Sequence, residues 1–133
     1  MTNPTTTADM PQTPEKWLTC NGQQFKKLAR AALFWLEKHQ QTVNALNVFP
    51  VPDGDTGTNM LLTMRSAWRG IKDSPETHVG KLSQAFSKGA LMGARGNSGV
   101  ILSQIWRGIA RELEGKEYFT AADLGAAFQS ASD

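Results

Sequence analysis

The stretch NVFPVPDGDTGTNM, residues 47–60, separates two helical segments of this sequence. Pro50 and Pro52 lack a backbone N–H and fix their own φ angles, so an α-helix cannot continue through them. Phe49 and Val51 each precede a proline and are pushed toward extended geometry. The segments before and after this stretch are therefore predicted to be two distinct helices joined by a stiff connection.

Apolar residues on both sides of this stretch recur three and four positions apart, which is typical of amphipathic helices. No alternating strand pattern of useful length is present, so the predicted fold class is all-α. Five helices are predicted: from Asn21 to Asn44–Asn47, from Gly57 to about Ile71, from about Val79 to Leu91, one following the glycine-rich residues 92–99, and one beginning after Thr120.

Two of these predicted helices have clear capping signals at their starts. The side chain of Asn21 can cap the free amides of the first helix. Thr120 is followed by Asp123 at the third helical position, which is a variant of the capping box. In the first helix, Leu33, Phe34 and Trp35 widen the apolar face, and we expect that helix to be well buried.

Length and composition exclude several classes of protein. The chain has 133 residues, 40% of them hydrophobic, which fits about one packed domain. A net charge of +2 without a long basic run provides no reason to expect nucleic acid. Cys20 is the single cysteine, so neither a disulfide scaffold nor a structural zinc site is expected.

No targeting signal is recognisable in the sequence. No window holds the roughly 18 consecutive apolar residues of a membrane span, and residues 1–15 have no apolar core that would mark a secretory signal. We therefore expect a cytoplasmic protein. Residues 1–15 are rich in Thr and Pro and are predicted to be a disordered tail, with the domain occupying residues 16–133.

Two carboxylates close to one another suggest a metal site in the quoted stretch. Asp53 and Asp55 flank Gly54, which permits a sharp turn, so both carboxylates can converge on one cation. Hard cations such as Mg²⁺ prefer oxygen ligands, and Asn47 could supply a further one. The alternative is an ordinary turn in which Asp55 or Thr56 caps the following helix.

The residues after the aspartates open a helix and are suited to phosphate. Helix N-termini carry free N–H groups and a partial positive charge, and the hydroxyls of Thr56 and Thr58 add donors beside Gly57 and Asn59. An EF-hand is excluded because its sixth and twelfth positions would hold Thr58 and Met64. An aspartyl-phosphate hydrolase with Asp53 as nucleophile is a weaker alternative, because a proline-broken segment is a poor central strand.

A second glycine-rich stretch, GARGNSGVILSQ, also precedes a helix. Gly96 permits close backbone approach, Asn97 and Ser98 offer polar donors, and Arg95 could neutralise phosphate charge. The stretch is not a Walker A motif, and alone it is equally consistent with a helix–loop–helix turn. Together with the paired aspartates, it suggests a nucleotide held by a metal ion and backbone amides.

NALNVFPVPDGDTGTNM and GARGNSGVILSQIWRG resemble the nucleotide-binding domain of the bacterial fatty acid kinase A subunit, which is similar to the L subunit of dihydroxyacetone kinase. The resemblance runs from about Asn21 to the end of the chain. It implies an antiparallel barrel of eight helices that binds ATP through two Mg²⁺ ions held by acidic side chains. About five of those helices are counted here, so we expect a partial, truncated form of the domain.

By position, the resemblance makes Asp53 and Asp55 the metal-binding aspartates, with Asn47 as the nearest candidate for a third ligand. Residues 56–59 match the phosphate loop, and Asn97 and Ser98 match nucleotide contacts of the second loop. Candidate catalytic residues are Asp53, Asp55 and Arg95.

The expected activity is ATP-dependent phosphoryl transfer, either to a fatty acid carboxylate presented by a separate B-type subunit or to a dihydroxyacetone-like hydroxy ketone. A homodimer is a further possibility. The alternatives are a non-catalytic nucleotide-binding or interaction fragment and, less favoured, the aspartyl-phosphate hydrolase.

Overall fold

The computed structural model describes residues 19–46 and 54–132, and these residues form five helices and two short strands. The predicted all-α class is confirmed. No helix in this part of the chain combines the length and the apolar content that a membrane crossing requires. The predicted tail, Asn47 and Asp53 lie outside the described residues.

In chain order the elements are β1 (Thr19–Asn21), α3 (Gly22–Ala45), α4 (Thr56–Arg69), α5 (Val79–Met92), α6 (Gly96–Glu112), β2 (Tyr118–Thr120) and α7 (Ala121–Ser132).

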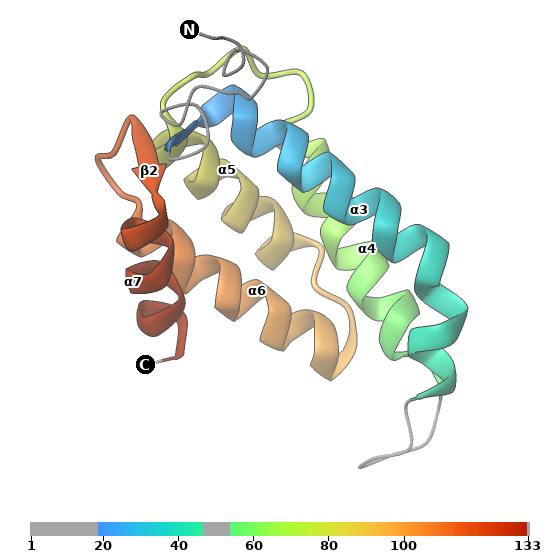
Figure 1. The fold of residues 1–133 in the computed structure, drawn as a ribbon. Coiled ribbons are helices and arrows are strands. Elements are labelled where there is room, and N and C mark those ends of the chain that lie inside the picture. The colour runs from blue at the N-terminus through green and yellow to red at the C-terminus, as the bar shows by residue number, and fades with distance from the viewer. Residues whose placement is uncertain (1–18, 47–53, 133) are drawn as a thin grey trace, which may run out of the picture.

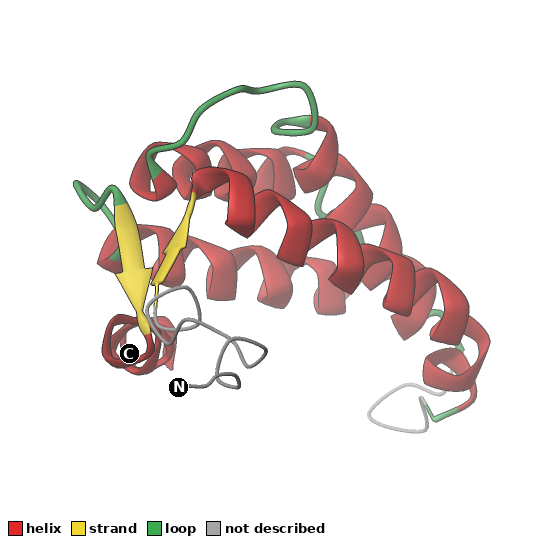
Figure 2. Ribbon diagram, turned by 45° about the horizontal axis from the view of Figure 1, so that its top comes forward, coloured by secondary structure: helices red, strands yellow, loops and turns green. Residues whose placement is uncertain are grey.

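α3, α4, α5 and α6 each pack against the next helix and alternate in direction, whereas α7 packs across α6 at a steep angle (Figure 1 and Figure 2). α4 contacts α6 as well as its sequence neighbours α3 and α5. This arrangement brings the end of α3 and the starts of α4 and α6 to one end of the molecule. The two strands lie at the other end, where α3 and α7 begin (Figure 2).

Side-chain caps define the starts of α3 and α7, as predicted. Asn21 Oδ1 accepts the backbone N–H of Gln24 at 3.0 Å, and Gln24 Oε1 accepts the backbone N–H of Asn21 at 2.8 Å. At α7, Asp123 Oδ2 accepts the backbone N–H of Thr120 at 2.9 Å, and Thr120 Oγ1 accepts the backbone N–H of Asp123 at 3.3 Å. Both predicted caps are therefore formed, and Gln24 makes the first of them a reciprocal box as well.

The cap of α7 should make stability depend on pH. The Thr120 backbone N–H, donated to its carboxylate, holds the pKa of Asp123 below its ordinary value. The ionised cap therefore stabilises the fold above the ordinary aspartate pKa of about 4, and this contribution is lost as the pH falls through the lower folded pKa. We expect Asp123→Asn to lower the free energy of unfolding at neutral pH, and the difference from the parent to shrink as acid is added.

Urea unfolding followed by circular dichroism across the acidic range measures this difference. Asp73→Asn is the matched control, because Asp73 is exposed and forms no hydrogen bond or ion pair within the described residues. A difference for Asp123→Asn that stays constant with pH would contradict the role of the charged cap.

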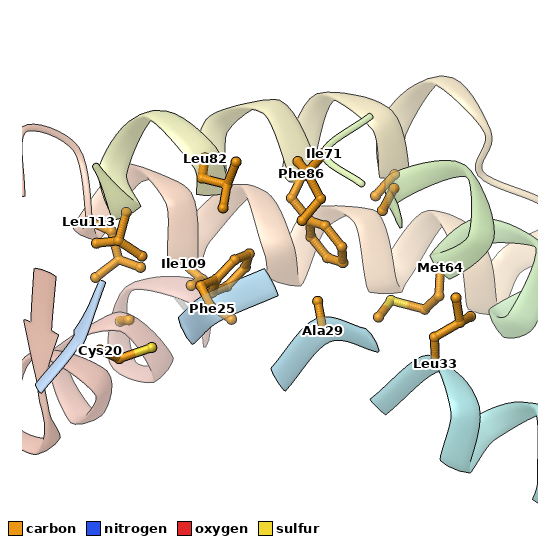
Figure 3. Packing of buried hydrophobic residues seen from close by; sticks show 14 of the residues in the cluster. Cys20, Phe25, Ala29, Leu33, Met64, Ile71, Leu82, Phe86, Ile109 and Leu113 are labelled. Atoms are coloured by element: carbon orange, nitrogen blue, oxygen red, sulfur yellow. The ribbon is translucent and has the colours of Figure 1, made fainter. Parts of the chain in front are cut away.

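An aromatic cluster forms the centre of the core and joins three helices. The ring of Phe25 from α3 meets the rings of Phe86 from α5 and Trp106 from α6 edge to face, at centroid distances of 5.5 and 6.0 Å. The rings of Phe86 and Trp106 are 4.7 Å apart. Figure 3 shows Phe25 and Phe86 among the aliphatic side chains of the surrounding helices. Phe86 is completely buried, so it is the central packing residue of this cluster.

The small antiparallel sheet was not predicted. Its strands are three residues each, and Cys20 on β1 pairs with Phe119 on β2. Such short strands show no recognisable alternation in the sequence, so their pairing depends on tertiary contacts. Both Cys20 and Phe119 are buried, and burial raises the pKa of the Cys20 thiol to about 11. The cysteine is therefore a packing residue that stays protonated at neutral pH.

The prediction that α3 is well buried is wrong for two of its large side chains. Leu33 is buried, but Phe34 is 64% exposed and Trp35 is 56% exposed. Within the described residues, α3 packs against α4 and α5 on one side only, so a run of consecutive apolar residues cannot all face the core. The Trp35 ring stacks on the His39 imidazole, with centroids 4.2 Å apart.

Candidate functional site

Thr58, in the first turn of α4, is held by two side chains of α3. Gln40 Nε2 and Asn44 Nδ2 donate to Thr58 Oγ1 at 2.8 and 3.1 Å, and the Thr58 backbone N–H donates to Asn44 Oδ1 at 3.1 Å. Because the hydroxyl accepts two hydrogen bonds, its own proton remains for another partner. Gln40 and Asn44 were not predicted as site residues. Their spacing of four, on one face of the helix before the motif, was the available signal.

Gly57 allows α3 and α4 to approach closely at this point. A Cβ atom there would lie 2.6 Å from the backbone oxygen of Gln40 and 3.0 Å from Asn44 Oδ1. The absent side chain therefore faces α3, while the backbone N–H of Gly57 remains at the start of α4. Close packing of the two helices thus requires glycine at this position, a reason that the sequence did not show.

The two glycine-containing motifs meet in space. Gly96 has a φ of 65°, and a Cβ atom there would overlap the side-chain amide of Asn59. Thr63 Oγ1 donates to the backbone oxygen of Asn59 at 2.8 Å and accepts the backbone N–H of Arg95 at 3.2 Å. A Cβ on Gly99 would overlap that same hydroxyl. The starts of α4 and α6 therefore lie side by side, joined by the hydrogen bond from Arg95 to Thr63 and by the packing of Gly96 on Asn59.

These two helix starts differ from those of the other helices in the described residues. α3, α5 and α7 are each capped by a side chain at or beside their first residue. Asp55 and Arg95 occupy the N-cap positions of α4 and α6, and neither side chain makes a capping hydrogen bond. At the start of α4, only the N–H of Thr58 is satisfied by a side chain, and that side chain comes from α3. The remaining first-turn N–H groups have no protein partner within residues 19–46 and 54–132.

The first turns of α4 and α6, which meet through Asn59 and Gly96, form a junction whose electrostatics favour an anion. Two helix N-termini, each with a partial positive charge, lie next to each other, and the exposed Arg95 adds a full positive charge. Asn97 is exposed and Ser98 is half-buried in the first turn of α6. The arrangement therefore brings together the residues of both predicted loops and leaves their N–H donors available to phosphate oxygens.

Of the predicted metal ligands, only Asp55 lies within the described residues. The Asp55 carboxylate is exposed at the start of α4, follows Gly54 with its φ of 70°, and is not used to cap the helix. Its oxygens are therefore available, and they suit a hard cation. No group of three or more His, Cys, Asp or Glu side chains gathers within the described residues. The other predicted ligands, Asp53 and Asn47, lie outside them.

Neither histidine ring is hydrogen-bonded to a residue of this junction. His78 caps α5, with Nδ1 accepting the backbone N–H of Lys81 at 3.2 Å. The His39 ring nitrogen Nδ1 pairs with the backbone oxygen of Trp35 at 2.9 Å. Both side chains therefore support local helical structure.

The chain is similar in sequence to several longer bacterial proteins. The chain is 48% identical over 115 residues to Protein YloV of Bacillus subtilis, which covers 86% of the chain and 21% of that relative. It is 50% identical over 98 residues to an uncharacterized protein of Staphylococcus saprophyticus, covering 74% of the chain and 18% of the relative. An uncharacterized protein of Staphylococcus haemolyticus is 44% identical over 113 residues, with coverages of 85% and 20%. The chain thus spans about a fifth of the length of these relatives.

Residues 50–133 match the family model of the DAK2 domain. This match begins within the proline stretch and includes the described parts of both motifs, Thr56–Asn59 and Gly96–Gly99. Because it covers more than half of the sequence, the chain belongs to the DAK2 domain family and is a dihydroxyacetone kinase L-like domain.

Proposed function

We propose that this domain binds Mg²⁺·ATP at the junction of α4 and α6 and transfers the γ-phosphate to an acceptor. The observation that carries the proposal is the pair of helix starts joined through Asn59 and Gly96, both without a capping side chain of their own. Such a junction presents several unpaired N–H donors to one anion. Membership of a kinase-related domain family supports a nucleotide as that anion.

Each residue of the junction has a defined task in this proposal. The Thr58 hydroxyl proton and the N–H groups of Thr56 and Gly57 donate to phosphate oxygens at α4. The first-turn N–H groups of α6 do the same. Arg95 stabilises the negative charge that develops on the transferred group. These donors are fixed in place by α3 and by the contact between α4 and α6, so little reorganisation is required when the nucleotide binds.

Asp55 and Asp53 are the proposed ligands of Mg²⁺, with Asn47 as a candidate for a further oxygen. The exposed carboxylate of Asp55, with no capping bond, fits this role. When bound, the metal neutralises phosphate charge and so supports phosphoryl transfer. A site with two ions would require both aspartates, as the resemblance implies.

We propose a fatty acid carboxylate, presented by a B-type partner subunit, as the acceptor. A carboxylic acid with a pKa of about 4 to 5 is already ionised at neutral pH, so its attack needs no general base. The ring Nδ1 atoms of His39 and His78 both pair with backbone groups outside the junction, which supports an acceptor of this kind. A dihydroxyacetone-like hydroxy ketone is the second candidate, because the family is dihydroxyacetone kinase-like.

Calorimetric titration of the chain with ATP, with and without Mg²⁺, tests the nucleotide site. We expect binding to weaken at least about tenfold when Mg²⁺ is replaced by EDTA, since phosphate charge would then face the Asp55 carboxylate without a cation. Equal affinity in both buffers would contradict the metal-dependent site.

Turnover is tested separately from binding. Adding a fatty acid loaded on a B-type subunit should produce an acyl phosphate, which hydroxylamine traps as a hydroxamate. Mg²⁺·ATP binding without turnover for any acceptor would favour a non-catalytic module. A covalent phosphoryl label on Asp53 would favour the hydrolase, because direct transfer leaves none.

A further inference from the structure

A cavity lies between α5 and α6, away from the nucleotide junction. Its volume is about 170 Å³. Gln104 is eight residues beyond Gly96, so this part of α6 lies about 12 Å along the helix axis from its start. The cavity is lined by Gln84, Ser87, Lys88 and Leu91 of α5 and by Ser103, Gln104 and Arg107 of α6.

Several donors of this cavity have no protein partner. Lys88, Gln104 and Arg107 are exposed at the rim of the cavity. Within the residues that the structure describes, Lys88 and Arg107 form no ion pair, and Gln104 forms no side-chain hydrogen bond. Ser87 is only 8% exposed, and its hydroxyl has no hydrogen-bond partner in the same residues. Among the described residues this oxygen is not one of the fully buried polar atoms that lack a partner, so it is open to the cavity and can donate to a bound group.

The charge around the cavity specifies the sign of that ligand. Two cationic side chains contribute to its wall and no carboxylate does. α5 contains no Asp or Glu, and the single acid of α6 is Glu112, at its last residue. Gln84 Nε2 donates to the backbone oxygen of Ala110 at 2.8 Å and so braces the two helices against each other. The cationic groups are therefore presented by a fixed pair of helices.

We propose that the α5–α6 cavity is a binding site for a small oxyanion, a carboxylate or a phosphate group. Lys88 and Arg107 supply the positive charge, Ser87 and Gln104 donate hydrogen bonds, and the Leu91 side chain forms an apolar wall for the attached carbon group. The volume accommodates a group of this size and is well below that of a pocket for a drug-sized ligand.

NMR titration of the ¹⁵N-labelled 133-residue chain with sodium phosphate or sodium acetate, at matched ionic strength against sodium chloride, tests the site. We expect saturable shifts at Ser87, at the Gln104 side-chain amide and at the Arg107 Nε–H. Tighter saturation by phosphate would identify a phosphate ligand, and tighter saturation by acetate a carboxylate ligand.

Substitutions of the cavity side chains test whether any saturable shift comes from binding in this cavity. Lys88→Gln and Arg107→Gln should each weaken saturation roughly tenfold or more, and Ser87→Ala roughly two- to tenfold. Lys81→Gln is the matched control, because it removes an exposed charge from the same helix without touching the cavity. Shifts that stay linear, or that are unchanged in the Lys88→Gln and Arg107→Gln variants, would overturn the proposal.

The same spectra distinguish this cavity from the nucleotide site. Phosphate shifts confined to Gly57 and Asn97 would overturn the cavity proposal and leave the nucleotide proposal standing. Conversely, saturable shifts at Ser87 and Arg107 would support the cavity even if ATP did not bind.

Discussion

Asp55→Ala is expected to lower Mg²⁺-dependent turnover by a factor of about 10² to 10³, the usual effect of removing one preorganised electrostatic group from a transition state. The exposed carboxylate is the proposed metal ligand at the start of α4. Since it makes no capping hydrogen bond, its removal should change the thermal midpoint very little. Single-turnover kinetics with Mg²⁺·ATP, together with calorimetric binding, would measure the loss.

Asp73→Ala is the control for that experiment. Asp73 is an exposed acid in the turn after α4, and its replacement removes the same charge from the chain. We expect this variant to retain the parental Mg²⁺·ATP affinity. If Asp55→Ala binds and turns over Mg²⁺·ATP as the parent does, Asp55 is not a metal ligand. If both variants lose activity equally, the effect is one of net charge.

Phe86→Ala is expected to lower the free energy of unfolding by about 3–5 kcal/mol, the usual cost of deleting a buried aromatic ring. The ring is fully buried and meets Phe25 and Trp106 edge to face, so its loss leaves a cavity between α3, α5 and α6. A domain of this size is stable by about 5–15 kcal/mol, so a large share of stability would be lost. Urea unfolding followed by circular dichroism measures the change.

Phe128→Ala is the matched comparison, because Phe128 is 56% exposed on α7. The same atoms are deleted from a side chain that buries much less surface, and we expect a change of about 1 kcal/mol or less. Similar losses for both variants would mean that the isolated chain does not pack around Phe86 as the structure shows.

Helix positions could largely be predicted because their signals are local. Asn21 and Thr120 were each expected to cap a helix, and both caps are formed. α3 ends at Ala45, before Pro50 and Pro52, as the geometry of proline requires. The predicted helix at Gly57 begins one residue earlier, at Thr56, and the predicted fourth helix includes the glycine-rich residues from Gly96 onward.

Features that depend on other elements could not be predicted. Thr58 was expected to face phosphate, and the spacing of Gln40 and Asn44 places both on one face of the preceding helix, but only the packing of α3 against α4 brings that face to Thr58. Phe34 and Trp35 were expected in the core because periodicity cannot decide which of three consecutive apolar residues faces inward. Asp53 and Asn47 remain predictions, since they lie outside the described residues.

The support that α3 gives to Thr58 bears on how the domain should be cut for expression. The family match begins at residue 50, yet within the described residues the side chains that hydrogen-bond Thr58 are those of Gln40 and Asn44. A chain trimmed to residues 50–133 would keep both glycine motifs and lose the amides that orient the first turn of α4. A trimmed chain that preserves the geometry of the α4 start therefore includes α3, from its capping residue Asn21 onward.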